Sequence, residues 1–379
     1  NVINDAYAYC DDYKKFLNGG KTERECVAQT VEMAKAKGYR NLNTVIANGE
    51  KLNPGDCVYS DFMGKALMLF KIGKQPIFKG LNIVGAHIDS PRIDLKQNPL
   101  YEDTDFAYLD THYYGGIKKY QWVAMPLAMH GVVAKKDGTL VNIVIGEDPS
   151  DPVIGISALL PHLSRDQMSK KGSVVIEGEE LNIIIGSIPY HDEENEKIKN
   201  PAKLLAMKLL NERYGITEKD FTRAEIEMVP AYKAVDIGLD RGLVGAYGQD
   251  DRVCAYTALM AEIGTKNPEH TTFTILTDKE EIGSVGNTGL HSDYVHHAVE
   301  DLAESFGADT KTVLRHSICL SSDVNAAYDP TFASVYESRN SSYVNKGCVL
   351  TKYTGARGKS GSSDASAETM AKVFGIMEE

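Results

Sequence analysis

Residues 271–289 read TTFTILTDKEEIGSVGNTG, an apolar and β-branched run followed directly by acidic and glycine-rich sequence. The composition of residues 271–277 is typical of a buried strand. Glu280 and Glu281 follow it as neighbours, and ionising both is costly unless a cation lies nearby. In a two-metal hydrolase, one such glutamate binds metal and the other takes a proton from the attacking water. The stretch therefore predicts a strand that ends at a metal site.

A second apolar run, LNIVGAHI at residues 81–88, also ends in polar residues. Side chains two apart in a strand point to the same face, so the Asp89 carboxylate can hydrogen-bond the far ring nitrogen of His87. That bond would orient the ring and make it a better metal ligand. The alternative is a local hydrogen bond between a His and an Asp on a strand edge.

Two further acidic positions follow predicted elements in the same manner. Asp250 and Asp251 begin a predicted helix, and Asp323 follows a predicted strand at residues 317–321. Taken singly, helix capping and a local turn explain these acids. Taken with His87, they supply nitrogen and oxygen ligands without thiolate, which suits zinc, manganese or cobalt in a catalytic role.

The order of predicted elements indicates an α/β fold, with a mixed, mostly parallel sheet flanked by helices. Such sheets bind ligands at the carboxyl ends of their strands. We predict that residues 1–90 and 241–379 form the catalytic α/β domain, and that residues 91–240 are an inserted β-rich domain. The predicted helices and strands that carry this division are listed here in chain order: helix 21–37, strand 81–88, strands 131–134, 140–146, 173–176 and 181–188, helix 201–214, helix 251–263, strand 271–277, a helix after residue 293, strand 317–321 and helix 365–377.

Composition argues against nucleic acid and membranes as partners. The 379 residues include 53 acidic and 41 basic side chains, a net charge of −12, and the sequence has no basic stripe for nucleic acid or anionic lipid. Apolar runs such as residues 181–186 are far shorter than the roughly 18 residues that span a bilayer. Six scattered cysteines without CxxC spacing, and no signal peptide in residues 1–13, predict a cytoplasmic protein.

At these motifs the sequence resembles the aspartyl aminopeptidase family, relatives of vacuolar aminopeptidase I. The similar stretches run in the family's order over nearly the whole chain. They are YKKFLNGGKTERE at 13–25, GAHIDSPRIDLK at 85–96, PHL at 161–163, YGQDDR at 247–252, TDKEEIGSVGNTG at 277–289, SSDVNAAYDP at 321–330 and KYTGARGK at 352–359. The resemblance implies a zinc-exopeptidase-like fold whose inserted domain mediates dimers, which assemble into a dodecamer.

The resemblance also implies roles for individual residues at a centre that binds two divalent ions. Zinc is the expected metal, and manganese and cobalt are the alternatives. One ion is held by His87, Asp250 and Asp323. Asp250 bridges to a second ion that Glu281 also holds. Glu280 is then the general base, and Asp89 orients His87.

Three residues are candidates for substrate binding. The resemblance implies that His162, in the PHL stretch, enters the active site of a neighbouring subunit, and an ordinary turn histidine is the alternative. Lys352 and Lys359 are basic enough to meet an acidic N-terminal side chain, and a solvated basic loop is their alternative. The expected substrates are short peptides, with an acidic first residue as one preference.

One departure from the family concerns the second metal. The family closes that site with a histidine near the C-terminus, whereas the last histidine in this sequence is His316. We therefore expect that a C-terminal portion is lacking and that the second ion binds weakly.

Two other functions share this ligand set. A dinuclear deacylase or carboxypeptidase uses the same carboxylates but recognises a free carboxylate. A non-catalytic cage subunit would bind metal for stability alone.

Overall fold

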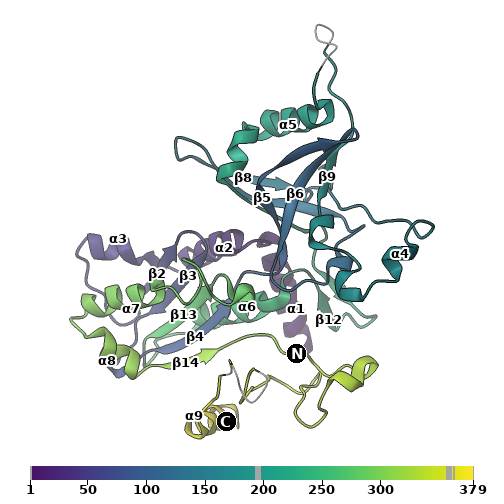
Figure 1. Ribbon diagram of the computed structural model, residues 1–379. Helices are drawn as coiled ribbons and strands as arrows, with labels where there is room; N and C mark the ends of the chain where they lie inside the picture. Colours follow the sequence, from purple (N-terminus) through teal and green to yellow (C-terminus); the bar gives the residue numbers. More distant parts are fainter. Residues whose placement is uncertain (1, 193–197, 356–360, 362, 379) are drawn as a thin grey trace. The chain divides into compact units, whose positions relative to one another are not determined.

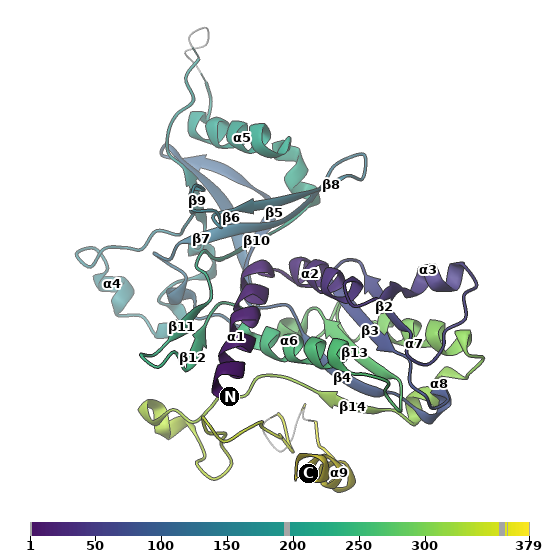
Figure 2. The ribbon, with the colours of Figure 1, turned by 180° about the vertical axis from the view of Figure 1, so that it is seen from behind.

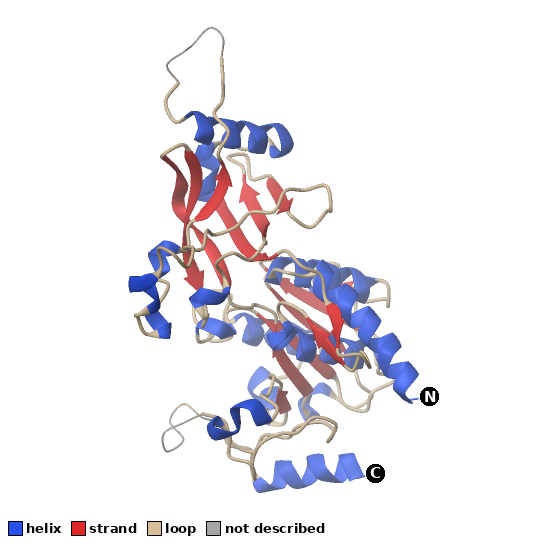
Figure 3. Ribbon diagram, turned by 90° about the vertical axis from the view of Figure 1, so that its right-hand side faces the viewer, coloured by secondary structure: helices blue, strands red, loops and turns tan. Residues whose placement is uncertain are grey.

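The structure is a computed structural model that describes residues 2–192, 198–355, 361 and 363–378. The chain divides into two compact units, residues 1–323 and 324–379. The first unit contains two six-stranded sheets, drawn as separate groups of red strands in Figure 3.

The first sheet is mixed and has the strand order β1-β2-β3-β13-β4-β14 (Figure 1). Its strands are β1 (Arg40–Asn41), β2 (Cys57–Phe62), β3 (Ala66–Lys71), β4 (Asn82–His87), β13 (Thr272–Thr277) and β14 (Ile318–Ser321). β13, β4 and β14 are parallel neighbours, in a register that pairs Thr277 with His87 and Ser321 with Gly85. The carboxyl ends of three adjacent strands therefore meet at one edge of the sheet.

Helices cover both faces of this sheet (Figures 1 and 2). One face packs against α1 (Val2–Gly19), α2 (Glu23–Lys35) and α6 (Gln249–Gly264). The other packs against α3 (Leu42–Ala47), α7 (Tyr294–Ser305) and α8 (Thr310–Arg315). β3 is buried at every residue, as expected for a strand with helices on both sides.

Local sequence explains where the predicted helices begin. The Thr22 side chain accepts a hydrogen bond from the backbone N–H of Glu25, and the Glu25 side chain accepts one from the backbone N–H of Thr22. The capping box at the start of α2 is therefore complete. α5 (Pro201–Tyr214) begins with Pro201 in its first turn and ends before Gly215 in the left-handed conformation. The predicted helices at 21–37 and 201–214 are confirmed, the first with shorter ends.

The second sheet is antiparallel, with the order β8-β7-β10-β5-β6-β9. Its strands are β5 (Arg92–Asp103), β6 (Phe106–Tyr114), β7 (Leu127–Ala134), β8 (Leu140–Ile145), β9 (Ile183–Gly186) and β10 (Ala224–Pro230). All of them lie within the predicted insertion at 91–240, whose boundaries as a domain stay a prediction. Thr104 and Asp105, both with positive φ, make the two-residue turn of the β5–β6 hairpin.

One predicted strand is wrong. Residues 173–176 form no strand, and a short 3-10 helix, η3 (Gly172–Val174), lies there instead. Ile176 is nevertheless buried in the core of the second sheet and Val175 packs against it, whereas Val174 is exposed. The stretch therefore contributes to that core from outside the sheet.

Short elements complete the first unit. They are η1 (Ile77–Lys79), η2 (Lys119–Gln121), α4 (Arg165–Met168), η4 (Gly178–Glu180), η5 (Glu218–Arg223), β11 (Val235–Ile237), β12 (Leu243–Gly245) and η6 (Glu280–Ile282).

The second unit contains η7 (Pro330–Val335) and α9 (Ala367–Glu378), close to the helix predicted at 365–377. None of its described residues is buried. Among the described residues of the whole chain, no helix is both long and apolar enough to cross a membrane.

Candidate metal centre

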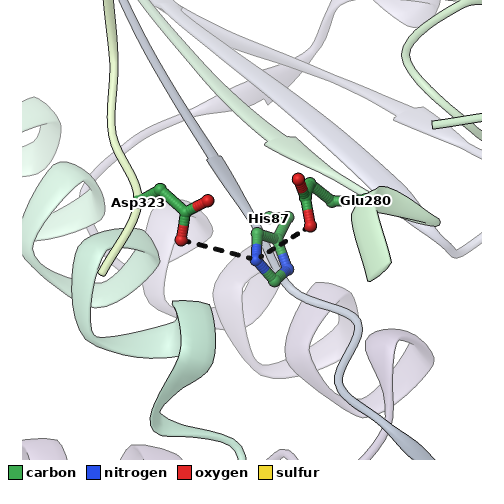
Figure 4. A group of neighbouring side chains, drawn as sticks. All are labelled: His87, Glu280 and Asp323. Carbon is green, nitrogen blue, oxygen red and sulfur yellow. Dashed lines mark ion pairs between the residues drawn. The ribbon is translucent and has the colours of Figure 1, made fainter. Parts of the chain in front are cut away.

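Carboxylates from three elements surround the imidazole of His87 at the carboxyl edge of the first sheet. His87 ends β4, Glu280 follows β13, and Asp323 follows β14. Figure 4 shows both carboxylates directed at the His87 ring. The distances from His87 Nε2 are 3.6 Å to Glu280 Oε2 and 3.9 Å to Asp323 Oδ1. Asp250 Oδ1, from the start of α6, lies 3.2 Å from the same nitrogen.

His87 has the features expected of a metal ligand. Its side chain is 2% exposed, and Nε2 has no hydrogen-bond partner of good geometry despite its burial. A buried ring nitrogen without such a partner, surrounded by carboxylate oxygens, fits a divalent cation. Burial lowers the pKa of His87, but the carboxylates of Asp250 and Asp89 outweigh burial and raise it to about 11 in the metal-free chain.

The possible ligand atoms fall into overlapping groups of three, in which all atoms lie within 4.8 Å of one another. The groups are His87, Glu280 and Asp323; His87, Asp250 and Glu281; and Asp250, Asp251 and Asp323. These groups share members, as expected for a centre with more than one ion. The division into a first and a second metal stays a prediction.

Asp89 is fully buried and lies behind His87. Its Oδ1 is 3.2 Å from His87 Nδ1, and its backbone carbonyl is 3.0 Å from the same nitrogen. The backbone N–H groups of Glu280 and Glu281 each donate to its carboxylate at 3.2 Å. Burial raises the pKa of Asp89, but bonds from His87 and Tyr114 outweigh it, so the pKa is below its ordinary value.

The neighbouring carboxylates behave differently. Burial, followed by the charge of Asp250, raises the pKa of Glu281 to about 7. Burial likewise raises the pKa of Glu280, and it raises that of Asp251 to about 7. Asp251 is 0% exposed, and neither of its carboxylate oxygens has a hydrogen-bond partner in the described chain. The centre therefore carries more negative charge than its own residues neutralise.

The three predicted substrate residues belong to different parts of the chain. His162 is exposed, in a turn before α4. Lys352 is exposed in the second unit, with its Nζ 5.4 Å from the ring centroid of Tyr353. Lys359 lies outside the described residues. The substrate roles of all three stay predictions.

A pocket that the sequence did not indicate adjoins the metal centre. Its volume is about 380 Å³, and its walls include Asp250, Ser90, Lys118, Trp122 and Tyr247. Lys118 is exposed there, and its ammonium group makes no ion pair with a described residue. No local pattern marks Lys118, because its place depends on how the loop after β6 meets the start of α6.

Comparison with known proteins identifies the family. The profile of the family described as "Aminopeptidase I zinc metalloprotease (M18)" matches residues 16–377. The chain belongs to this family. It is a metallo-aminopeptidase, and the predicted resemblance is confirmed.

Bacterial M18 relatives match over almost the whole chain. A "Probable M18 family aminopeptidase 1" of Clostridium acetobutylicum is 53% identical, over 99% of this chain and 81% of its own length. A protein of the same name from Thermotoga maritima is 44% identical, over 98% of this chain and 81% of its own length. The lack of a C-terminal portion is not confirmed by these matches.

Solved M18 structures share the fold. The crystal structure of the Thermotoga maritima aminopeptidase has a TM-score of 0.93 at 42% identity, covering 99% of this chain and 82% of that one. Aminopeptidase I from Clostridium acetobutylicum has a TM-score of 0.89 at 52% identity, covering 97% of this chain and 80% of that one. The α/β class of this metallo-aminopeptidase is thereby confirmed. The mApe1 dodecamer of S. cerevisiae, at 21% identity and a TM-score of 0.69, is similar in fold alone.

Proposed function

We propose that this M18 aminopeptidase uses two divalent ions to remove N-terminal residues from short peptides. The observation that carries the proposal is His87, a buried imidazole whose Nε2 has no hydrogen-bond partner of good geometry and lies 3.2–3.9 Å from the carboxylates of Asp250, Glu280 and Asp323. Zinc suits this mixed nitrogen and oxygen ligation, with manganese or cobalt as substitutes.

The proposed roles are those that the family resemblance implies, and they are supported by the closeness of these side chains to His87. His87, Asp250 and Asp323 would hold one ion, and Asp250 and Glu281 would hold the second. Divalent ions bound here would supply Lewis-acid activation of the scissile carbonyl and of the attacking water.

Glu280 takes the proton of the water and returns it to the leaving amine. Its carboxylate is partly exposed, which leaves it accessible to substrate, and burial raises its pKa above the ordinary value. General bases work best when the pKa lies near the working pH. Asp89 keeps the His87 ring in its orientation.

The general-base role predicts the effect of Glu280→Gln. Glutamine keeps the shape of the side chain but cannot take a proton, so turnover should fall by about a hundredfold or more. Zinc content should stay equal to that of the unchanged protein. Glu304→Gln, on an exposed position of α7, is the matched control and should retain full turnover. Equal turnover in the Glu280 variant would contradict its role.

Substrate class separates the proposal from a dinuclear deacylase or carboxypeptidase. The protein should hydrolyse amino-acid p-nitroanilides in the presence of zinc, manganese or cobalt, and it should leave N-acyl amino acids intact. Cleavage of only the acylated set would favour the deacylase. If neither set were cleaved although zinc bound, the chain would be a non-catalytic cage subunit.

A zinc titration tests the second ion. The described residues offer that ion only Asp250 and Glu281 from the predicted set, so we expect one tight and one weak equivalent per chain. Two tight equivalents would show that a further ligand completes the second site.

The pocket beside Asp250 gives a basis for preference toward an acidic N-terminal residue. With the amine at the metal centre, the first side chain would lie in the pocket that contains Lys118, whose ammonium group has no anionic partner among described residues. Lys118→Met should lower the rate with aspartyl p-nitroanilide by about tenfold relative to leucyl p-nitroanilide, because a hydrogen-bonded charge pair is lost. The neighbouring Lys119→Met is the control. If the ratio of the two rates were unchanged, Lys352 or Lys359 would be the candidate for binding an acidic N-terminal side chain.

Assembly and location complete the proposal. We propose a homo-oligomer built from dimers and reaching a dodecamer, which is the assembly of the solved yeast mApe1 structure. We also propose a cytoplasmic location, without nucleic-acid or membrane partners. Sedimentation of the purified protein tests the assembly, and a monomer at working concentration would contradict it.

A further inference from the structure

A tyrosine of the second sheet makes direct contact with the residue behind the metal ligand. Tyr114 is the last residue of β6, and its side chain is 9% exposed. Its hydroxyl donates a hydrogen bond of 2.7 Å to Oδ2 of Asp89. Asp89 and Tyr114 are 25 positions apart in sequence and are connected through the β5–β6 hairpin, so the bond depends on how that hairpin folds back.

The Asp89 carboxylate is fixed by donors on each oxygen. Oδ1 lies near His87 Nδ1 and accepts from the Glu280 backbone N–H, at 3.2 Å in each case. Oδ2 accepts from the Glu281 backbone N–H at 3.2 Å and from Tyr114 at 2.7 Å. The tyrosine bond is therefore the shorter of the two bonds that hold Oδ2.

Tyr114 is itself held in place. The guanidinium of Arg92, its antiparallel pairing partner on β5, lies 3.7 Å from the centroid of the ring. The next residue, Gly115, has a φ of +73°, and a Cβ there would lie 3.3 Å from Cβ of Glu281. The end of β6 thus lies directly against the turn that carries the two glutamates.

We propose that Tyr114 is a positioning residue for the metal centre, acting through Asp89 on the orientation of His87. Without the hydroxyl, Oδ2 keeps one longer bond, and the carboxylate gains freedom to rotate away from Nδ1 of His87. Partners of this kind behind a metal ligand change metal affinity or activity by about 10- to 100-fold when removed. The inference rests on the proposed function only in that His87 binds metal.

The test measures the zinc affinity of the protein by competition with a chromophoric chelator. Tyr114→Phe keeps the ring under Arg92 and removes only the donor, so zinc should bind about tenfold more weakly. Tyr113→Phe, one residue earlier on the same strand and 45% exposed, is the matched control and should change the affinity by less than about twofold.

A double-mutant cycle separates positioning from general destabilisation. If Tyr114 acts through Asp89, then Tyr114→Phe should have a much smaller effect on zinc affinity in an Asp89→Asn background than in the unchanged protein. A purely structural role would give the same effect in both backgrounds, and that result would overturn the inference even if the variant were less stable. Unchanged affinity in Tyr114→Phe would overturn it as well.

His87→Ala distinguishes failure of this inference from failure of the proposed centre. If His87→Ala leaves zinc affinity unchanged, the metal centre itself is wrongly placed. If His87→Ala weakens zinc binding and Tyr114→Phe does not, the centre stands and the role of Tyr114 is rejected.

Discussion

Arg92 is the cation on which a buried group of carboxylates depends. It begins β5 and is 6% exposed. Its Nε lies 2.9 Å from Asp94 Oδ1 and 3.4 Å from Glu227 Oε2, and its Nη1 lies 3.5 Å from Glu23 Oε2. The substitution Arg92→Met would keep much of the side-chain volume and remove the charge.

The expected cost follows from the burial of Glu23, which is 1% exposed. Burial raises its pKa, but Arg92 and then Lys65 outweigh burial and hold the pKa at about 2. Without Arg92, the cation left beside Glu23 among the described residues is Lys65, at 3.9 Å. Removing one partner of a buried ion pair costs about 3–5 kcal/mol, so we expect the free energy of unfolding to fall by about 4 kcal/mol at pH 7.

The sign of the pH dependence gives a sharper test. In the unchanged protein, the low pKa of Glu23 contributes stability above its unfolded value near 4.5, which is lost only as the pH falls through about 2. In the variant, burial would raise that pKa above the unfolded value, so the folded chain would bind a proton more tightly and gain stability as the pH falls. The loss of unfolding free energy caused by Arg92→Met should therefore be smaller at pH 5 than at pH 7.

Urea unfolding of the metal-free protein at pH 5 and pH 7, followed by circular dichroism, measures both effects. Arg24→Met is the matched control, because Arg24 and Glu225 form an ion pair with side chains 23% and 48% exposed. Such a pair contributes less than about 1 kcal/mol. The reasoning would be refuted if Arg92→Met lowered the free energy of unfolding no more than Arg24→Met does, or lowered it equally at both pH values.

Two further predictions concern the helix cap and the metal. Thr22→Ala removes the capping box of α2 and should lower the free energy of unfolding by about 1 kcal/mol, measured by the same urea titration; no change would mean that water replaces the cap. Zinc affinity should rise with pH between about 5.5 and 7.5, because His87 and Glu281 hold protons in the metal-free chain that zinc must displace. A flat profile in competition titrations would contradict this.

The candidate centre could be predicted because each of its residues lies at the end or the beginning of an element that is recognisable in the sequence. His87 ends an apolar run, Glu280 and Asp323 each come after one, and Asp250 begins a helix. The sheet then brings these positions together, since parallel strands in this register end at the same edge. The sequence could not give the distances around Nε2, which depend on side-chain packing at that edge.

Tyr114 and Lys118 could not be predicted, because their positions depend on tertiary contacts. Tyr114 is one of several tyrosines on β6, and only the fold of the hairpin brings its hydroxyl to Asp89. Helix α1 is a different case, since Tyr9, Tyr13 and Phe16 have helical spacing and all pack on Tyr256, yet no helix was predicted there. The helical spacing of these aromatic residues is a signal in the sequence that indicates a helix with one buried face.

The hydrogen-bond donors at the centre separate its carboxylates into two kinds. Asp89 is buried but receives Tyr114, two backbone N–H groups and the His87 ring, so its pKa falls and it stays ionised as a fixed negative group. Glu281 is partly buried, no described residue donates comparable hydrogen bonds to its carboxylate, and its pKa rises to about 7. Carboxylates whose environments separate their pKa values have different chemical roles. The charge that stays on Asp89 can orient His87, whereas Glu281, with a pKa of about 7, can exchange a proton near neutral pH.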